Sequence, residues 1–352
     1  MRKRIVKTTF ILQIFICIFF CGPNAKLDVF ASIGATIADN FIVDLVNKKI
    51  FEYDKISDPF IEGIQNIKKI DIIKDKSTQN KIIKIENEDS NIIYIELDKT
   101  NRIISYANNY VEKIGDSFLE HNTTLKSLEM NSVKEIGNKF CYKNKYIKDI
   151  SLNSVEKIGN NFFVNNMALI QINLPSVKEI GENCLYKARR LRIVHMPKLE
   201  KVGPRFLYSS DELEYIELEN LKEAASNFLY NGEKVKEAHF PKLEIVGSGF
   251  MKWNRELIKF DLPCLVIVEG SFLASNNSLL YLNCPALKIT SYEFLTLNRC
   301  LLEFNAPNIE KAESDIIYQI PSINKAILEQ IANKEKQKVK TLVNNNKIES
   351  HI

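Results

Sequence analysis

The chain has 352 residues and a hydrophobic share of 45%, which is the composition of a globular protein rather than a disordered one. Its formal net charge is +4 at pH 7. The segment from Met1 to Ala31 accounts for this charge, because it contains five basic residues and one acidic residue. The rest of the chain is therefore close to neutral, which argues against a nucleic-acid partner held by phosphate contacts.

The N-terminus has the three parts of a secretory signal peptide. A basic stretch from Arg2 to Lys7 precedes an apolar run from Thr8 to Gly22, and Val29-Phe30-Ala31 supplies a small-residue cleavage pattern. We expect residues 1–31 to be a signal peptide and the mature chain to be secreted or exposed at the cell surface. An uncleaved anchor is one alternative, although the apolar run is shorter than the roughly 20 residues that span a bilayer. Lipidation of Cys21 is another, although bulky side chains precede it.

A 22-residue repeat dominates the chain from residue 103 to residue 324. Apolar residues recur at equal steps over ten copies without an insertion, which indicates a repeat architecture. The clearest column consists of Phe118, Phe140, Phe162, Cys184, Phe206, Phe228, Phe250, Phe272, Phe294 and Ile316. A second column consists of Leu125, Ile147, Leu169, Leu191, Leu213, Val235, Leu257, Leu279, Leu301 and Ile323.

One repeat unit, from Leu169 to Arg190, predicts a single coil of a solenoid. Ile172 and Leu174 alternate, so they lie on one side of a short extended strand. Val177 and Ile180 form a second short apolar segment. The segment that follows, which is Phe-Leu-Tyr in the consensus of the repeats, is too short for an independent helix, and we expect a helical or 3₁₀ turn there. Stacked coils, with strands about 4.8 Å apart, bury the apolar columns in one continuous core.

Two further columns mark the turns of the coil. Glycine is expected to supply a positive φ at Gly115, Gly137, Gly159, Gly181, Gly203 and Gly247. Asparagine suits a turn that its side chain closes by hydrogen bonds to the backbone, at Asn122, Asn144, Asn166, Asn254, Asn276 and Asn298.

The repeat resembles the BspA-type leucine-rich repeats of bacterial surface proteins over about residues 103–324, with a unit one residue shorter than is typical there. The resemblance implies a leucine-rich repeat solenoid, α/β to mostly β in class, with ten 22-residue coils that combine short strands with helical turns. It also implies a secreted or surface-displayed protein, since several members of that family resemble adhesins that bind host matrix or other cells.

The segments on either side of the repeat differ from it. Residues 32–102 form an N-terminal leader, in which the β-like runs Lys81 to Ile85 and Ile92 to Leu97 predict a hairpin that caps the first coil. Residues 325–352 form a C-terminal helix or tail with one apolar side. A cap over the last coil is the favoured interpretation of this helix, and a lysine-rich membrane-surface helix is the alternative.

The residues with chemical potential are few. No nucleophile motif, phosphate-binding loop or HExxH motif occurs, so we expect no enzyme activity and no cofactor. His195, Glu217 and His239 share one strand column, and we considered zinc there. A polar surface ladder is the favoured interpretation, since the two histidines lie about 10 Å apart. The five cysteines after the leader lack zinc-site spacing, and Cys141, Cys184 and Cys284 occupy apolar columns.

The exposed columns of the strands provide the candidate binding site, because the extended face of a solenoid is its usual binding surface and tyrosine is enriched in interfaces. The predicted ligand-binding residues are Ile193, His195, Tyr215, Glu217, Glu237, His239, Lys259, Asp261 and Tyr281. The expected partner is a protein or other macromolecule, such as host matrix or another cell, and neither a nucleic acid nor a small-molecule cofactor. The alternative is a structural or self-associating cell-envelope protein whose solenoids stack end to end.

Export predicts a defined N-terminus. N-terminal sequencing of the native protein should begin at Ser32 or within a few residues of it, because cleavage is expected after Ala31. Recovery of the intact N-terminus at Met1 in the cytosolic fraction would contradict export.

Overall fold

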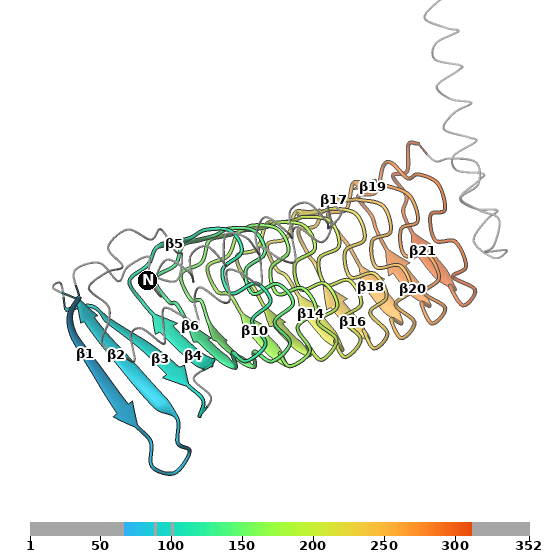
Figure 1. The fold of residues 1–352 in the computed structure, drawn as a ribbon. Coiled ribbons are helices and arrows are strands. Elements are labelled where there is room, and N and C mark those ends of the chain that lie inside the picture. The colour runs from blue at the N-terminus through green and yellow to red at the C-terminus, as the bar shows by residue number, and fades with distance from the viewer. Residues whose placement is uncertain (1–66, 88–89, 100–101, 312–352) are drawn as a thin grey trace, which may run out of the picture.

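The computed structural model describes residues 67–87, 90–99 and 102–311. The signal peptide, most of the leader and the C-terminal helix, all three of them expectations from the sequence, lie outside these residues. The described chain forms a solenoid of nine complete coils, residues 103–300, followed by the start of a tenth, and the coils stack along one axis (Figure 1). Within this part of the chain, no helix is long and apolar enough to cross a membrane.

Each of the first eight coils contributes two short strands, which lie on opposite sides of the core (Figure 1). After the first coil, the first strand of each coil has three residues and pairs in parallel with strands one repeat away, as in Gln171↔Ile193. These strands are β6 (Ser127–Glu129), β8 (Asp149–Ser151), β10 (Gln171–Asn173), β12 (Ile193–His195), β14 (Tyr215–Glu217), β16 (Glu237–His239), β18 (Lys259–Asp261), β20 (Tyr281–Asn283) and β21 (Glu303–Asn305). Their outward surface is called the strand face below.

The second strand of each coil has two residues, and eight such strands form one parallel sheet on the other side of the solenoid. They are β5 (Lys113–Ile114), β7 (Glu135–Ile136), β9 (Lys157–Ile158), β11 (Glu179–Ile180), β13 (Lys201–Val202), β15 (Glu223–Ala224), β17 (Ile245–Val246) and β19 (Ile267–Val268). In the ninth coil, two parallel bridges from Ile289, to Ile267 and to Lys311, take the place of this strand. The outward surface of these strands is called the ladder face below.

Antiparallel strands precede the first coil. β1 (Ile67–Lys74) pairs with β2 (Lys81–Asn87), and β2 pairs with β3 (Ile92–Leu97). β2 and β3 contain the two runs from which the sequence predicts a hairpin, whereas β1 was not expected. β3 then pairs antiparallel with β4 (Ile103–Asn108), the first strand of the first coil, and β4 pairs in parallel with β6. The first coil thus has a paired strand on both sides.

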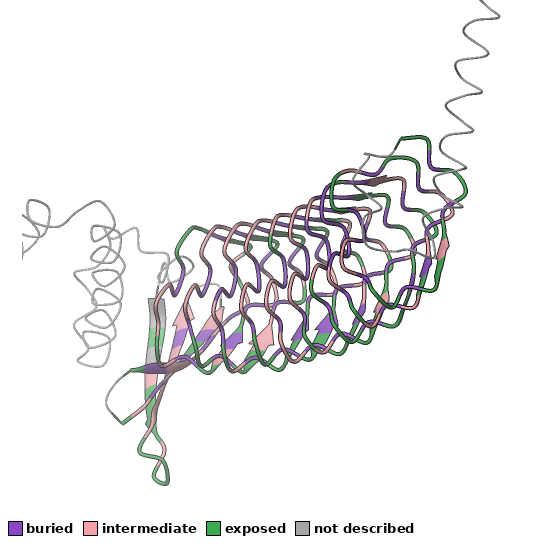
Figure 2. Ribbon diagram, turned by 90° about the vertical axis from the view of Figure 1, so that its right-hand side faces the viewer, coloured by how far each residue is buried: buried purple, intermediate pink, exposed green. Residues whose placement is uncertain are grey.

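The predicted apolar columns form the core throughout the described residues. Phe206, Phe228, Phe250 and Phe272 are fully buried, and rings from successive coils lie over one another, as with Phe228 and Phe250, whose centroids are 5.1 Å apart. Figure 2 shows the same alternation of buried and exposed positions in coil after coil. The leucine-rich repeat solenoid predicted from the sequence is therefore confirmed.

The expected helical turn is wrong. Lys139, Cys141 and Lys143 have φ values of 59°, 50° and 57°, and the same three positions have positive φ in every complete coil. The N–H groups of Lys139 and Lys143 donate to the following coil, at 2.7 and 3.0 Å, and that of Cys141 donates to the preceding coil at 2.9 Å. In a helix these N–H groups would point along the helix axis. Here φ is positive at every second residue, and the N–H groups therefore point to the preceding and the following coil. Hydrogen bonds between coils therefore hold a backbone that non-glycine residues rarely adopt.

The role expected for the glycine column is also wrong. Gly249, which lies outside that column, is the only glycine with positive φ among the described residues. The column instead permits close approach of the backbones: a Cβ on Gly203 would lie 2.6 Å from the carbonyl carbon of Gly181. Glycine fits this position because the backbone of the preceding coil occupies the space of a side chain.

The asparagine column closes turns as expected in the first three coils. The Oδ1 atoms of Asn122 and Asn166 accept the N–H groups of Leu125 and Leu169, both at 2.8 Å. In later coils the same column also links neighbours, since the N–H of Asn276 donates to Oδ1 of Asn298 at 3.0 Å.

Phe228→Ala should lower the free energy of unfolding by roughly 3–5 kcal/mol, because it removes a fully buried ring from the stack. Urea unfolding of this variant, compared with exposed Leu302→Ala as the control, measures the loss. Equal midpoints for the two variants would mean that the phenylalanine column does not form the core.

Gly203→Ala should lower stability by about 1–3 kcal/mol through overpacking, whereas Gly115→Ala should change it little. A Cβ on Gly115 has no neighbour within 4 Å among the described atoms, although the residue belongs to the same column. Thermal unfolding of both variants tests this, and equal losses would contradict the close-approach explanation.

Candidate functional site

The structure places all nine predicted site residues on the strand face, along β12, β14, β16, β18 and β20. None of their side chains is buried, because residues on either side of a core-facing strand residue point outward. Ile193, Tyr215 and Tyr281 are 55%, 47% and 38% exposed. The strand face therefore carries three large side chains that the core does not use.

The nine residues fall into two groups. His195 pairs in register with Glu217, and Glu217 with His239, so β12, β14 and β16 form one sheet. β18, β20 and β21 form a separate sheet. The break between the two sheets lies between β16 and β18. At this point β16 has the small residue Ala238 at its centre. Phe240, which follows β16, packs edge-on against Phe260 of β18, with ring centroids 5.9 Å apart.

Hydrogen bonds along the strand face orient several of its side chains. The hydroxyl of Tyr215 donates to Oε2 of Glu217 at 2.8 Å, and this bond raises the pKa of Tyr215. In the second group, Nδ2 of Asn283 donates to Oδ1 of Asp261 at 2.7 Å. Nowhere in the described chain do three histidine, cysteine or carboxylate side chains converge on a metal-sized site.

The ladder face carries a regular pattern of lysine and glutamate side chains, called the checkerboard below, which form ion pairs between adjacent coils. Lysine and glutamate alternate from coil to coil. In the pair Lys178–Glu156, whose Nζ and Oε2 atoms are 2.8 Å apart, the hydrogen bond raises the pKa of Lys178 and lowers that of Glu156. Further pairs are Lys134–Glu112, Lys113–Glu135, Lys222–Glu200 and Lys201–Glu223. Because these pairs are exposed, each contributes little to stability.

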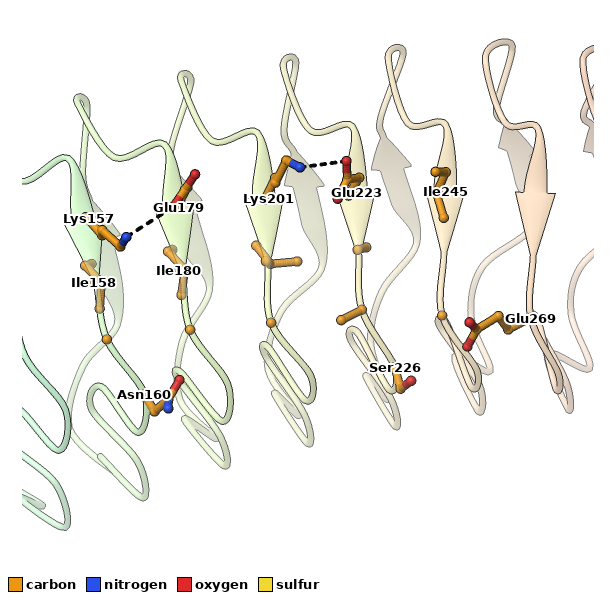
Figure 3. Close-up of a pocket in the computed structure, with 17 residues that line it drawn as sticks. Lys157, Ile158, Asn160, Glu179, Ile180, Lys201, Glu223, Ser226, Ile245 and Glu269 are labelled. Atoms are coloured by element: carbon orange, nitrogen blue, oxygen red, sulfur yellow. Dashed lines mark ion pairs between the residues drawn. The ribbon is translucent and has the colours of Figure 1, made fainter.

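A groove of about 580 Å³ runs beside this checkerboard. Its floor follows the glycine column from Gly159 to Gly247, where the lack of side chains leaves the backbone open. Figure 3 shows the ion pairs Lys157–Glu179 and Lys201–Glu223 on one side of the groove. These groups neutralise one another, so they offer a ligand little unpaired charge.

Comparison with known families identifies the repeat. The family model for the BspA type leucine-rich repeat region matches residues 78–191 and 156–280, in six copies that together span more than half of the chain. The chain belongs to the BspA-type leucine-rich repeat family. No curated protein matches it.

Two solved structures are similar to this BspA-type chain. A leucine-rich repeat protein from Bacteroides ovatus ATCC 8483 is 17% identical, with a TM-score of 0.26, over 53% of this chain and 67% of that one. A leucine rich cell surface protein from Faecalibacterium prausnitzii A2-165 is 14% identical, with a TM-score of 0.22, over 64% of this chain and 95% of that one.

The BspA-type chain also carries a tyrosine stack that sequence reasoning missed. Tyr186, Tyr208 and Tyr230 lie over one another at 5.0 and 4.7 Å between centroids, and Trp253 follows at 5.3 Å from Tyr230. The signal was present in the sequence as tyrosines at equivalent positions of three successive repeats.

The cysteines of the described repeat are free. Burial raises the pKa values of Cys141 and Cys184, the latter to about 12, so these thiols stay protonated at neutral pH and pack as small hydrophobes. Cys284 is likewise buried, whereas Cys264 and Cys300 are exposed.

Proposed function

We propose that this protein is an exported, non-catalytic binding protein that holds a macromolecular partner on its strand face, in the manner of an adhesin. The partner is a protein, such as a component of host matrix or of another cell. The observation that carries the proposal is the exposure of Ile193, Tyr215 and Tyr281 on one face of a regular solenoid. Export rests on the signal-peptide pattern of residues 1–31.

These three side chains are suited to binding rather than to folding. Each coil already fills its core from other columns, so the exposed side chains contribute little to stacking. Interfaces typically depend on a few aromatic anchors. The bond from Tyr215 to Glu217 holds one such anchor in place before binding, which reduces the entropy lost when a partner immobilises it.

The arrangement of the N-terminal end favours binding over end-to-end assembly. β1, β2 and β3 extend the sheet beyond β4 in antiparallel order, so β4 of the first coil does not present its edge for stacking. The strand face remains accessible along the described coils, as an extended binding surface requires.

Combining Tyr215→Ala with Tyr281→Ala should weaken partner binding at least roughly tenfold, because a lost anchor typically removes more than about 1.4 kcal/mol. The mature chain is first used to capture a partner from matrix proteins and whole cells, and the affinity of each variant is then measured against that partner. Thermal unfolding should be nearly unchanged.

Tyr292→Ala is the matched control, since this tyrosine is similarly exposed but follows the glycine column on another side of the coil. Equal affinities for the double variant and the control would move the site off the strand face, most simply to the leader at residues 32–102.

A further inference from the structure

A patch of mixed basic and apolar character lies at one edge of the strand face. It consists of three loops, residues 145–148, 167–170 and 189–192, which lead into β8, β10 and β12. The loops occupy equivalent positions in three successive coils. Adjacent coils are joined here by backbone contacts, such as the N–H of Arg192 to the carbonyl of Ile170 at 2.8 Å. The loops are therefore about 4.8 Å apart. We call this surface the basic–apolar patch.

The centre of the patch is apolar and exposed. Met167 and Ile170 of the middle loop are 45% and 46% exposed, and Tyr146 of the first loop is 52% exposed. Ile193 continues this apolar surface into the strand that follows the third loop. Large apolar side chains gathered in this way on a soluble surface mark an interaction site more often than scattered ones do.

Basic side chains flank this centre on both sides. Lys145 and Lys148 are exposed in the first loop, and Arg190 is exposed in the third. Within the described part of the chain, no acidic side chain lies within ion-pair distance of these three. They differ in this from the paired lysines of the ladder face, and their charge is available to a partner.

The next loop along the solenoid is acidic and fixes the other two arginines. Asp211 lies 3.6 Å from Arg189, and Glu212 lies 3.2 Å from Arg192. A cavity of about 390 Å³ is lined by these four side chains together with Ile170 and Arg190. The unpaired guanidinium therefore borders a concave site beside an exposed aliphatic side chain.

We propose that the basic–apolar patch docks an acidic protein segment that carries an aliphatic side chain. The aliphatic group packs on Met167 and Ile170, and flanking carboxylates pair with Lys148 on one side and with Arg190 on the other. An apolar centre with a polar rim is the usual anatomy of a protein interface. This inference rests on the proposed function and names the chemistry of the partner at one edge of the strand face.

The acidic loop distinguishes this partner from other polyanions. An anionic membrane or a long polyanion would also cover Asp211, Glu212 and Glu214, which would repel it. A short acidic segment spans only the three loops of the patch and meets cations on both sides. The observations therefore favour a peptide segment over a lipid surface.

The test uses the mature chain and a fluorescent peptide in which glutamate and aspartate alternate with leucine, measured by anisotropy. Two matched peptides replace leucine by serine or the acidic residues by lysine. The acidic leucine peptide should bind, and both replacements should weaken binding at least about tenfold. Raising the ionic strength from about 0.1 M to about 1 M should weaken it as well, because the Debye length falls from about 10 Å to about 3 Å.

Variants of the chain locate the site. Combining Lys148→Glu with Arg190→Glu should weaken binding of the acidic leucine peptide at least about tenfold. Arg255→Glu with Arg299→Glu should not, although it makes the same change in charge at exposed turn positions. Ile170→Ser should weaken binding, whereas Ile258→Ser, at the equivalent exposed position four coils away, should not. Circular dichroism and thermal unfolding identify any variant that fails to fold.

Three results would overturn the inference: no binding of the acidic leucine peptide, equal losses in the matched control variants, or binding of anionic phosphatidylserine vesicles through Lys148 and Arg190 in place of the peptide. Because this assay uses a synthetic peptide, its failure leaves the test on Tyr215 and Tyr281 with the captured partner intact. Failure of that test in turn leaves the peptide result standing.

Discussion

A 22-residue coil cannot bury its own leucine, isoleucine and phenylalanine side chains, and the rest of the structure depends on this constraint. The coils must stack at the spacing of parallel strands, about 4.8 Å, so that each core residue packs against the same position of its neighbours. This spacing accounts for the backbone features of the turns. Glycine occurs where the backbone of the preceding coil lies in the space that a Cβ would take, as at Gly203. Left-handed φ values occur where N–H groups must reach coils on both sides, as at Cys141.

Because the coils stack in register, residues at equivalent positions of successive repeats lie in rows on the surface. These rows differ in the charged and apolar side chains that a partner could contact. On the ladder face, alternating lysine and glutamate satisfy each other from coil to coil, as in Lys222–Glu200. On the strand face, Tyr215 and Tyr281 stand free of the core. At its edge, Lys148 and Arg190 flank exposed Ile170, and among the described residues no acidic side chain lies within ion-pair distance of either. On a regular solenoid, a binding surface is therefore marked by columns of exposed side chains that do not pair with one another, rather than by any one pocket.

Sequence reasoning predicted the features that follow from spacing alone. The constant length of the repeat determines which side chains enter the core, such as Phe228, and which leave it, such as Ile193. The reasoning was wrong where conformation is set by contacts between coils: neither the alternating φ values around Cys141 nor the close approach at Gly203 is visible in one repeat unit. It also missed the basic–apolar patch. Met167 and Ile170 belong to columns that are basic in neighbouring coils, and only exposure shows that they form one surface with Arg190.

Chemical footprinting of lysines tests the central claim, that partners bind the strand face, most directly. The mature chain is acetylated with and without its captured partner, and the reactivity of each lysine is followed by mass spectrometry. Lys148 and Lys259, which are exposed along the strand face, should lose reactivity when the partner binds, whereas Lys157 and Lys201 of the ladder face should keep it. Protection of Lys157 and Lys201 with unchanged reactivity at Lys148 and Lys259 would contradict the account.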